Sequence, residues 1–203
     1  MFPHLPAVAE HPEDTEPAAL FERAHKKFGP SPLPLALRRL ARSPVLFRDA
    51  ILNLEHVLSE RPPLPRRERL LLGIGIAAAV EAPSLSSWLD SLAEDIPHAE
   101  RRGAIEAAFA CRTLNAYYRG RSLIEVPGLD HAHAHLRASP LVSAGLPKRS
   151  IELLSTAVSV AMACRSCATA HARAAMEAGA ALPEVDEVIR LQAVLVALAP
   201  LDR

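Results

Sequence analysis

Apolar residues recur along the chain at helical spacing, and prolines fall mostly between these stretches. Ala, Leu, Arg and Glu, which are good helix formers, dominate each stretch, and no convincing run alternates apolar and polar residues as a half-buried strand would. Proline opens or stops a helix more readily than it continues one, so it marks helix ends. The pattern predicts an all-α fold with helices at 17–28, 34–42, 44–60, 65–81, 84–95, 97–119, 148–162, 164–178 and 183–199.

Two of these helices carry clear end signals. Ser43 followed by Pro44 is typical of a helix start, because serine caps the first turn and proline fits its first position. Gly179 suits the residue just after a helix, where a left-handed backbone is common. We expect residues 120–147 to form a long connection with one short helix, and residues 1–16, rich in proline and acidic residues, to form an N-terminal arm.

The chain contains an internal repeat at an offset of 82 residues. Segment 64–67 (Leu-Pro-Arg-Arg) and segment 146–149 (Leu-Pro-Lys-Arg) each lead into an apolar run, and later helices follow Pro97 and Pro183. A chance match between two Leu-Pro-basic segments is the alternative reading. The offset pairs four polar residues of the second copy with apolar residues of the first: Glu152 with Leu70, Cys164 with Ala82, Cys167 with Leu85 and His171 with Leu89.

The repeat suggests how the chain is organised. We expect one compact domain, in which residues 17–119 form an inactive helical half, 120–147 a connection and 148–203 an active half. A chain of 203 residues, half of them hydrophobic, is long enough to bury one sizeable core.

Charge and composition exclude several classes of partner. The formal net charge is zero, so nothing favours nucleic acid or an anionic membrane, and an aromatic content of 4% leaves few surfaces on which bases could stack. The N-terminal segment has no basic region followed by an apolar run, so we expect no signal peptide. The apolar stretch 70–80 is too short to span a bilayer. A cytoplasmic protein is the expectation.

The most informative motif is Cys164-Arg-Ser-Cys167, with His171 four residues later and Glu152 twelve residues upstream of Cys164. Two thiols three residues apart can close a disulfide or donate two electrons, and three cysteines in all are too few for a secreted disulfide framework. At about 100° per residue, both cysteines and His171 fall on one face of a helix. The free N–H groups and positive dipole at its start favour thiolate over thiol.

The spacing suggests a role for each residue. Cys167 and His171 are i and i+4 neighbours, so we expect Cys167 to be the nucleophile and His171 its base. Cys164, at what we expect to be the more exposed tip of the helix, is then the resolving thiol. Glu152 comes from the preceding helix and orients His171 or relays its proton. This is thiol redox chemistry, and we expect no bound cofactor or metal.

Other readings of these residues stay open. The four side chains are plausible zinc ligands, although a Cys and a His within one helical turn fit tetrahedral coordination poorly, or the thiols are buried and inert. Elsewhere, Cys111 is read as a small core residue and Trp88 as a core or interface anchor. Three alternating histidines are read as solvated side chains, with capture of a transition metal as the alternative: His131, His133 and His135.

The motif resembles the alkylhydroperoxidase D (AhpD) family, within the wider carboxymuconolactone decarboxylase-like superfamily. The match runs from Glu152 through eleven residues to Cys164-x-x-Cys167 and then His171. It extends to segment 145–148 (Gly-Leu-Pro-Lys) and to segment 115–121 (Asn-Ala-Tyr-Tyr-Arg-Gly-Arg), which is similar to the N-x-[FY]-Y-R-G-R segment of AhpD proteins.

The resemblance implies an AhpD-like multi-helix bundle of two related halves, assembled as a homo-oligomer such as a trimer. It implies reduction of organic hydroperoxides, or of a peroxiredoxin partner, with electrons from an external dithiol, a dihydrolipoyl group on another protein. By the family pattern Cys167 is peroxidatic, Cys164 resolves, and Glu152 and His171 relay protons. Family members often carry a further His between the cysteines, where this chain has Ser166.

Two rival functions remain at this stage. The first is a non-redox, carboxymuconolactone decarboxylase-like enzyme that uses Glu152 and His171 as acid and base, a chemistry with no need of paired cysteines. The second is a zinc- or redox-sensing protein whose helices bind a partner.

Overall fold

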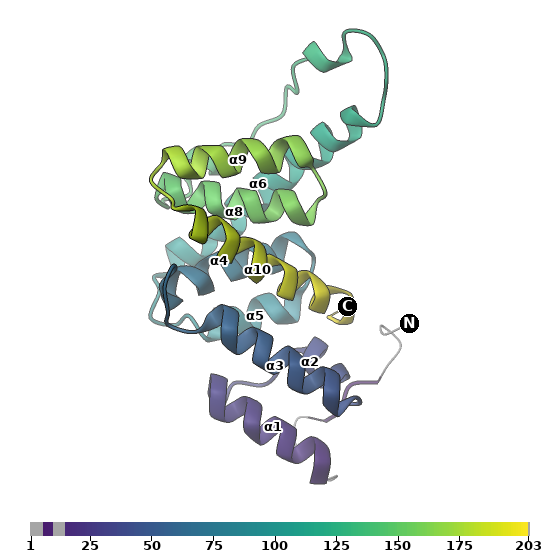
Figure 1. Ribbon diagram of the computed structural model, residues 1–203, viewed down its shortest axis with the longest axis vertical. Coiled ribbons are helices and arrows are strands. Elements are labelled where there is room, and N and C mark those ends of the chain that lie inside the picture. The colour runs from purple at the N-terminus through teal and green to yellow at the C-terminus, as the bar shows by residue number, and fades with distance from the viewer. Residues whose placement is uncertain (1–5, 10–14, 203) are drawn as a thin grey trace.

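The computed structural model describes residues 6–9 and 15–202, and their regular structure is helical (Figure 1). In this part of the chain β-type pairing is limited to an isolated bridge between Arg61 and Leu64. All nine expected helices are present, so the all-α prediction is confirmed. They are α1 (Thr15–Phe28), α2 (Leu35–Leu40), α3 (Pro44–Leu58), α4 (Arg66–Ala79), α5 (Pro83–Ser91), α6 (His98–Ser122), α8 (Lys148–Ala161), α9 (Arg165–Glu177) and α10 (Leu182–Leu198).

The connection expected at 120–147 differs in detail. Helix α6 continues to Ser122, because the first strong helix breaker after it is Pro127. Two short helical pieces follow where one was expected, η2 (Leu129–His131) and α7 (Pro140–Ser143). The arm expected at 1–16 lies largely outside the described residues. Within it, the Val8 amide donates to the Arg38 carbonyl of α2 at 3.0 Å.

The predicted helix ends agree with the structure where they were most specific. Ser43 is the N-cap residue of α3 and Pro44 its first helical residue, although the Ser43 side chain makes no capping hydrogen bond. Gly179 follows α9 with a φ of 96°, the left-handed conformation that its position required. No helix in the described part of the chain has the length and apolar character needed to cross a membrane.

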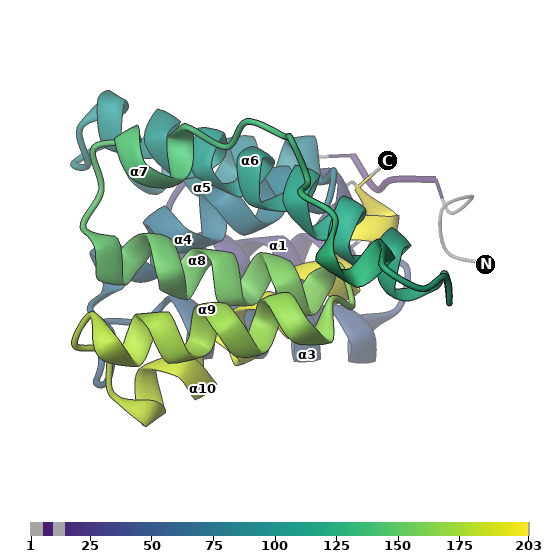
Figure 2. The ribbon, with the colours of Figure 1, turned by 90° about the horizontal axis from the view of Figure 1, so that it is seen from above.

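Helices α8 and α9 form an antiparallel pair at the end of the molecule opposite α1 (Figure 1). Figure 2 shows α8 between α6 and α9, and α8 contacts both helices as well as α10. The segment after α6 loops away from the body before it returns to α7 (Figure 1). The α8–α9 pair, which carries the cysteine motif, is therefore backed by α6 on one side.

The two copies of the repeat share backbone details that the sequence alone did not show. Helices α4 and α8 end in the same turn, with Glu81 at a φ of 60° and Ala163 at a φ of 53°. In each turn the amide of the following residue donates to the carbonyl five residues earlier at 3.0 Å. The donors are Ala82, to Ala77, and Cys164, to Ser159. These residues lie 82 apart, but α9 ends in the same kind of turn, with Gly179 left-handed and the Ala180 amide bonded to the Ala175 carbonyl at 2.9 Å, so the two-copy organisation stays a prediction.

Ion pairs also follow the repeat. Arg67 of α4 pairs with Glu100 of α6 at 2.8 Å, and Arg149 of α8 pairs with Glu184 of α10. Each pair joins the first turn of one helix to the first turn of the helix two further along the chain. Arg149 also contacts Glu68 of α4 at 2.7 Å and so links the two copies.

A buried ion pair holds the first copy to α10. Arg69 is fully buried and pairs with Glu187, which is 1% exposed. The other N–H groups of Arg69 donate to backbone carbonyls near the start of α4, including those of Leu64 at 2.7 Å and Arg61 at 3.1 Å. Burial raises the pKa of Glu187, but the pairing with Arg69, Arg61 and Arg190 outweighs it, and the net pKa lies below its ordinary value.

Candidate active site

Cys164 and Cys167 form a disulfide at the junction of α8 and α9, with their Cα atoms 5.4 Å apart. The junction is a tight turn because Ala163 adopts a left-handed conformation and its amide bonds to the Val160 carbonyl at 3.0 Å. Cys164 is the N-cap residue of α9, and its carbonyl accepts the Ala168 amide at 2.9 Å. The turn therefore fixes the backbone on both sides of the first cysteine.

The relative exposure of the two cysteines is the reverse of the expected one. Cys164 is 3% exposed, whereas Cys167 is only partly buried. The expectation was wrong because it placed Cys164 at a free helix tip, whereas the turn after α8 folds this residue against the body. Cys167, one turn into α9, is the more accessible sulfur.

His171 and Glu152 meet across the α8–α9 interface. The Glu152 Oε2 atom lies 2.7 Å from His171 Nδ1, and both side chains are largely buried. Glu152 comes from the preceding helix, the arrangement that the sequence suggested. Contact between His171 and Cys167, expected from their i, i+4 spacing, stays a prediction, because in the disulfide form the ring nitrogen Nδ1 faces Glu152.

Cys111 is the residue that sequence reasoning missed. It is 1% exposed on α6, as expected for a core residue, but its neighbours are polar. Its Sγ lies 3.6 Å from the Ser155 carbonyl, 3.1 Å from Asn115 Nδ2 and 3.9 Å from Ser159 Oγ. The available signal was spacing, since Cys111 and Asn115 lie four apart on α6, and Ser155 and Ser159 four apart on α8.

The pKa of His171 is set by opposing effects. Burial of the ring disfavours its charged form and lowers the pKa. Hydrogen bonds with Cys111 and Glu152, together with the electrostatic attraction of both groups, outweigh burial, and the net pKa of His171 lies above its ordinary value. The site therefore favours the imidazolium form.

The segment 115–121 lies beside the disulfide. Arg119 Nη1 donates to the Met162 carbonyl in the α8–α9 turn at 2.9 Å. The Arg121 guanidinium lies over the Tyr118 ring, 5.0 Å from its centre, and donates to the Ala132 carbonyl at 2.6 Å. The segment thus ties the end of α6 both to the cysteine turn and to the connection that follows it.

A cavity of about 560 Å³ opens at this place. Its wall includes Ser166, whose hydroxyl lies 3.7 Å from Cys164 Sγ. Apolar side chains from the connection complete much of the wall, together with the arginine and tyrosine described above. The remaining lining residues are Ser122, Ile124, Glu125, Val126 and Pro127. The cavity thus borders the first turn of α9, although neither cysteine belongs to its lining.

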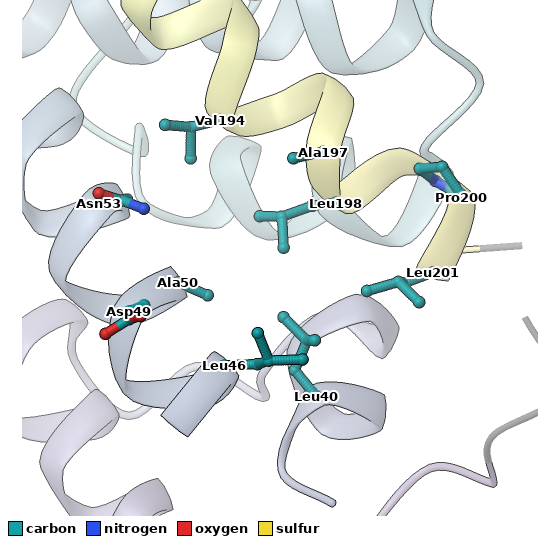
Figure 3. Close-up of a pocket in the computed structure, with 10 residues that line it drawn as sticks. All are labelled: Leu40, Leu46, Asp49, Ala50, Asn53, Val194, Ala197, Leu198, Pro200 and Leu201. Carbon is teal, nitrogen blue, oxygen red and sulfur yellow. The ribbon is translucent and has the colours of Figure 1, made fainter. Parts of the chain in front are cut away.

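A second cavity of about 510 Å³ lies between α3 and the end of α10 (Figure 3). Its wall is aliphatic apart from Asp49 and Asn53, and it includes neither cysteine of the disulfide, nor Glu152 or His171. The four candidate residues are absent from the lining of both cavities. Of the two, the cavity beside Ser166 is the one that borders the disulfide turn, because the Ser166 hydroxyl lies 3.7 Å from Cys164 Sγ.

The remaining candidate residues lie apart from the disulfide. Trp88 is a core residue whose ring meets Phe28 edge to face, with centres 5.2 Å apart. The rings of His133 and His135 lie 5.9 Å apart on the exposed connection. Among the described residues, no group of three His, Cys, Asp or Glu side chains converges as metal ligands would.

Comparison with known proteins identifies the family of this chain. The model of the carboxymuconolactone decarboxylase family matches residues 127–201, which include both cysteines, Glu152 and His171. The chain is 32% identical over 159 residues to the alkyl hydroperoxide reductase AhpD of Coxiella burnetii, covering 77% of this chain and 90% of that protein. It is 30% identical over 155 residues to the protein of the same name from Anaeromyxobacter dehalogenans, covering 75% and 82%.

Identity of this level over most of both chains is more than a shared motif. A match of 159 residues in a chain of 203 includes α4, α5 and α6, whichever end of the chain it omits. The chain therefore belongs to the AhpD family, within the carboxymuconolactone decarboxylase-like superfamily.

Proposed function

We propose that this protein is a thiol-dependent alkyl hydroperoxide reductase whose redox pair is Cys164 and Cys167. The observation that carries the proposal is their disulfide at the start of α9, beside the His171–Glu152 pair. Relatives about 30% identical over most of the chain are named alkyl hydroperoxide reductase AhpD, which supports the same class of activity here.

Cys167 is the peroxidatic sulfur in this scheme, because it is the more accessible of the two. Its thiolate attacks the outer oxygen of an organic hydroperoxide, forming an S–O bond and breaking the O–O bond. The alkoxide takes a proton from the His171–Glu152 pair and leaves as an alcohol. The thiol of Cys164 then attacks the sulfenic acid, which forms the disulfide and releases water.

An external dithiol returns the pair to the reduced state. One of its thiolates attacks the disulfide, and its second thiol resolves the mixed disulfide, so two electrons pass to Cys164 and Cys167. A dihydrolipoyl group on another protein is the donor we propose, with a peroxiredoxin disulfide as an alternative electron acceptor in place of peroxide. This cycle needs no resident cofactor, and it suits a reducing compartment such as the cytoplasm.

Assembly of a homo-oligomer is also proposed. Several large apolar side chains on the connection after α6 are more than half exposed, an arrangement typical of surfaces that contact another chain. They are Leu123, Ile124 and Val126. A second copy packed against this segment would cover them and narrow the cavity beside Ser166.

A coupled assay tests the function. We expect consumption of tert-butyl hydroperoxide to depend on dihydrolipoamide, and mass spectrometry to find the Cys164–Cys167 disulfide after oxidation without donor. Cys164→Ser should consume one equivalent of peroxide and stop. If the Cys164→Ser, Cys167→Ser double variant turned over peroxide at the wild-type rate, the two-thiol scheme would be wrong.

One observation supports a second candidate. The Glu152–His171 pair alone is an acid–base couple of the kind that a lactone decarboxylase needs, and the matching family model bears that enzyme's name. Under this alternative, alkylation of both thiols leaves activity on a carboxylated lactone intact. Peroxide consumption that depends on the same thiols favours the reductase.

A further inference from the structure

Positive charge gathers around the disulfide in a chain whose formal net charge is zero. Residues 115–177 run from the middle of α6 to the end of α9 and contain seven Lys and Arg but four Asp and Glu, whereas the whole chain has 23 of each. One of the four acidic residues, Glu152, faces His171. The region that carries the redox pair is therefore locally basic.

Most of this positive charge has no acidic partner within the chain. Of the seven Lys and Arg, Arg149 alone forms ion pairs among the described residues, with Glu68 and Glu184. Arginines of α4 and α10 behave differently, since Arg67, Arg69 and Arg190 each pair with a carboxylate. The cations near the disulfide remain available to a partner from outside.

Three of these arginines lie at the cysteine turn. Arg165 is the first residue of α9, directly after Cys164, and its side chain is exposed. Arg119 of α6 is also exposed and donates to a carbonyl of the α8–α9 turn at 2.9 Å. Arg121 shares the wall of a cavity with Ser166, whose hydroxyl lies 3.7 Å from Cys164 Sγ. We call Arg119, Arg121 and Arg165 the basic rim.

Nearby charges do not cancel the basic rim. Glu125 lies in the same cavity wall as Arg121 and offsets one positive charge. Arg112, which reaches Met162 of the turn through a separate cavity, is paired with Glu81 and adds no net charge. The start of α9 adds the partial positive charge of a helix N-terminus. The surface around the disulfide therefore carries a net positive charge.

We propose that the basic rim is the docking surface for an acidic face of the protein that carries the reducing dithiol. The docking role rests on the function proposed above, because it concerns the donor of that cycle. Opposite charges on two surfaces speed their encounter and fix their orientation. An uncharged organic hydroperoxide gains nothing from the same charges, so the basic rim acts on the reductive half of the cycle.

Docking brings the dithiol to the more accessible sulfur. A thiolate of the donor attacks Cys167 Sγ, and Cys164 leaves as a thiolate and takes up a proton. The second donor thiol loses its proton and attacks the mixed disulfide, which releases Cys167. The donor ends as a disulfide and the protein as a dithiol, so two electrons have moved and no further reactant is needed.

Reduction of the oxidised protein by two matched peptides tests the docking surface without peroxide. Each peptide carries one dihydrolipoyl-lysine, flanked by Asp and Glu in the first and by Ser and Gln in the second. At low ionic strength we expect the acidic peptide to reduce the Cys164–Cys167 disulfide about three- to tenfold faster, and the two rates to converge at about 0.5 M salt. Mass spectrometry after alkylation of the freed thiols gives the rates. Rates with hydroxyethyl disulfide correct for any intrinsic difference between the peptides.

Variants of the basic rim locate the effect. Arg165→Gln should lower the preference for the acidic peptide by about two- to threefold, and Arg165→Lys, which keeps the charge, should retain it. Addition of Arg119→Gln to Arg165→Gln should lower it further. Arg23→Gln makes the same change of charge on α1, at the opposite end of the molecule (Figure 1), and should leave the preference unchanged. The rate with the neutral peptide shows whether a variant alters the disulfide itself.

The outcomes separate the docking surface from the proposed function. Equal rates with both peptides, or equal effects of Arg165→Gln and Arg23→Gln, would overturn the docking surface even if peroxide turnover is normal. The expected preference in a protein that consumes no peroxide would overturn the proposed function and leave the docking surface standing. A disulfide that neither peptide reduces would overturn both.

Discussion

The helix pairs α4–α5 and α8–α9 share the same connecting turn but differ in the side chains that they bury. Both follow a Leu-Pro-basic segment, both close through a left-handed residue, and the amide after that residue bonds back at 3.0 Å in each. In the first pair the positions equivalent to the four candidate residues are fully buried hydrocarbon: Leu70, Ala82, Leu85 and Leu89. The same kind of helix pair thus holds a disulfide beside a Glu–His pair in one case and a packed core in the other.

The equivalence extends to the helix that backs each pair. A Cβ added at Gly73 of α4 would lie 3.4 Å from Leu89 and 3.8 Å from Leu195 of α10. The matching positions in the other pair are Ser155, His171 and Cys111 of α6, offset by 82 residues and, for the backing helix, 84. The comparison places α6 and α10 in equivalent positions, each beside one helix pair, with polar residues at the positions where the first pair has Gly73, Leu89 and Leu195.

The largest effect is expected when the second pair is given the first pair's residues. Cys164→Ala with Cys167→Leu should lower peroxide turnover by about 10³-fold or more, because both electron-carrying groups are lost. The measure is the dihydrolipoamide-coupled rate, with circular dichroism to confirm the fold. Ala82→Cys, at the equivalent buried position, is the matched control and should leave the rate unchanged. Retained turnover in the double variant would place the chemistry elsewhere.

The buried ion pair between Arg69 of α4 and Glu187 of α10 should affect the stability of the protein but not its activity. Glu187→Gln leaves the Arg69 guanidinium buried without its partner, which typically costs about 3–5 kcal/mol of unfolding free energy. Because the pKa of Glu187 is lowered in the folded state, its contribution is present above the unfolded pKa and is lost as pH falls through the folded one. Urea unfolding at neutral and acidic pH measures both. A loss below 1 kcal/mol at neutral pH would contradict the structure.

Equivalent positions in the two pairs should differ in what they contribute. Leu89→Ala removes a fully buried side chain and should destabilise the protein by about 2–5 kcal/mol. His171→Ala, at the matching position, should cost about 1 kcal/mol, since its ring is partly exposed and its loss leaves no apolar void. Unfolding in urea compares the two variants directly. Equal losses would mean that His171 is a packing residue.

The site should also give one pair a pH-dependent stability that the other lacks. The folded-state pKa of His171 is raised, so its contribution is fully present below the unfolded pKa and disappears as pH rises through the folded one. The difference in stability between wild type and His171→Leu, measured by thermal unfolding between pH 5 and 9, should show this decline. A flat difference over that range would mean that the ring is not stabilised as a cation.

The smallest effect concerns the shared turn. Ala163 holds a left-handed backbone that glycine adopts without strain, so Ala163→Gly should stabilise the protein by about 0.5–1 kcal/mol. Glu81→Gly relieves the same strain but loses the ion pair with Arg112, and the gain should be smaller. Chemical unfolding resolves the difference. Destabilisation by Ala163→Gly would show that the alanine side chain has a packing role at the cysteine turn.

Much of the fold followed from the sequence because its signals are local. Proline positions predicted where the helices begin and end. The 82-residue offset predicted that Cys167 is equivalent in sequence to Leu85. The exposure of Cys164 was not predictable, since it depends on a left-handed alanine that the sequence does not mark. Cys111 was interpreted as a small core residue, because its contact with the Ser155 carbonyl comes from another helix. Spacing within α6 alone does not reveal which residues of α8 lie against Cys111.

The turn between α8 and α9 has one more consequence, for how the proposed redox pair changes state. The amide and the carbonyl of Cys164 are both engaged by main-chain partners, Ser159 and Ala168, so the hairpin does not depend on the sulfur bridge for its shape. Reduction breaks the S–S bond, and the two freed sulfur atoms can then separate by rotation of their own side chains, without any change in the main chain. The same hairpin can therefore carry the bridged and the open form of the pair.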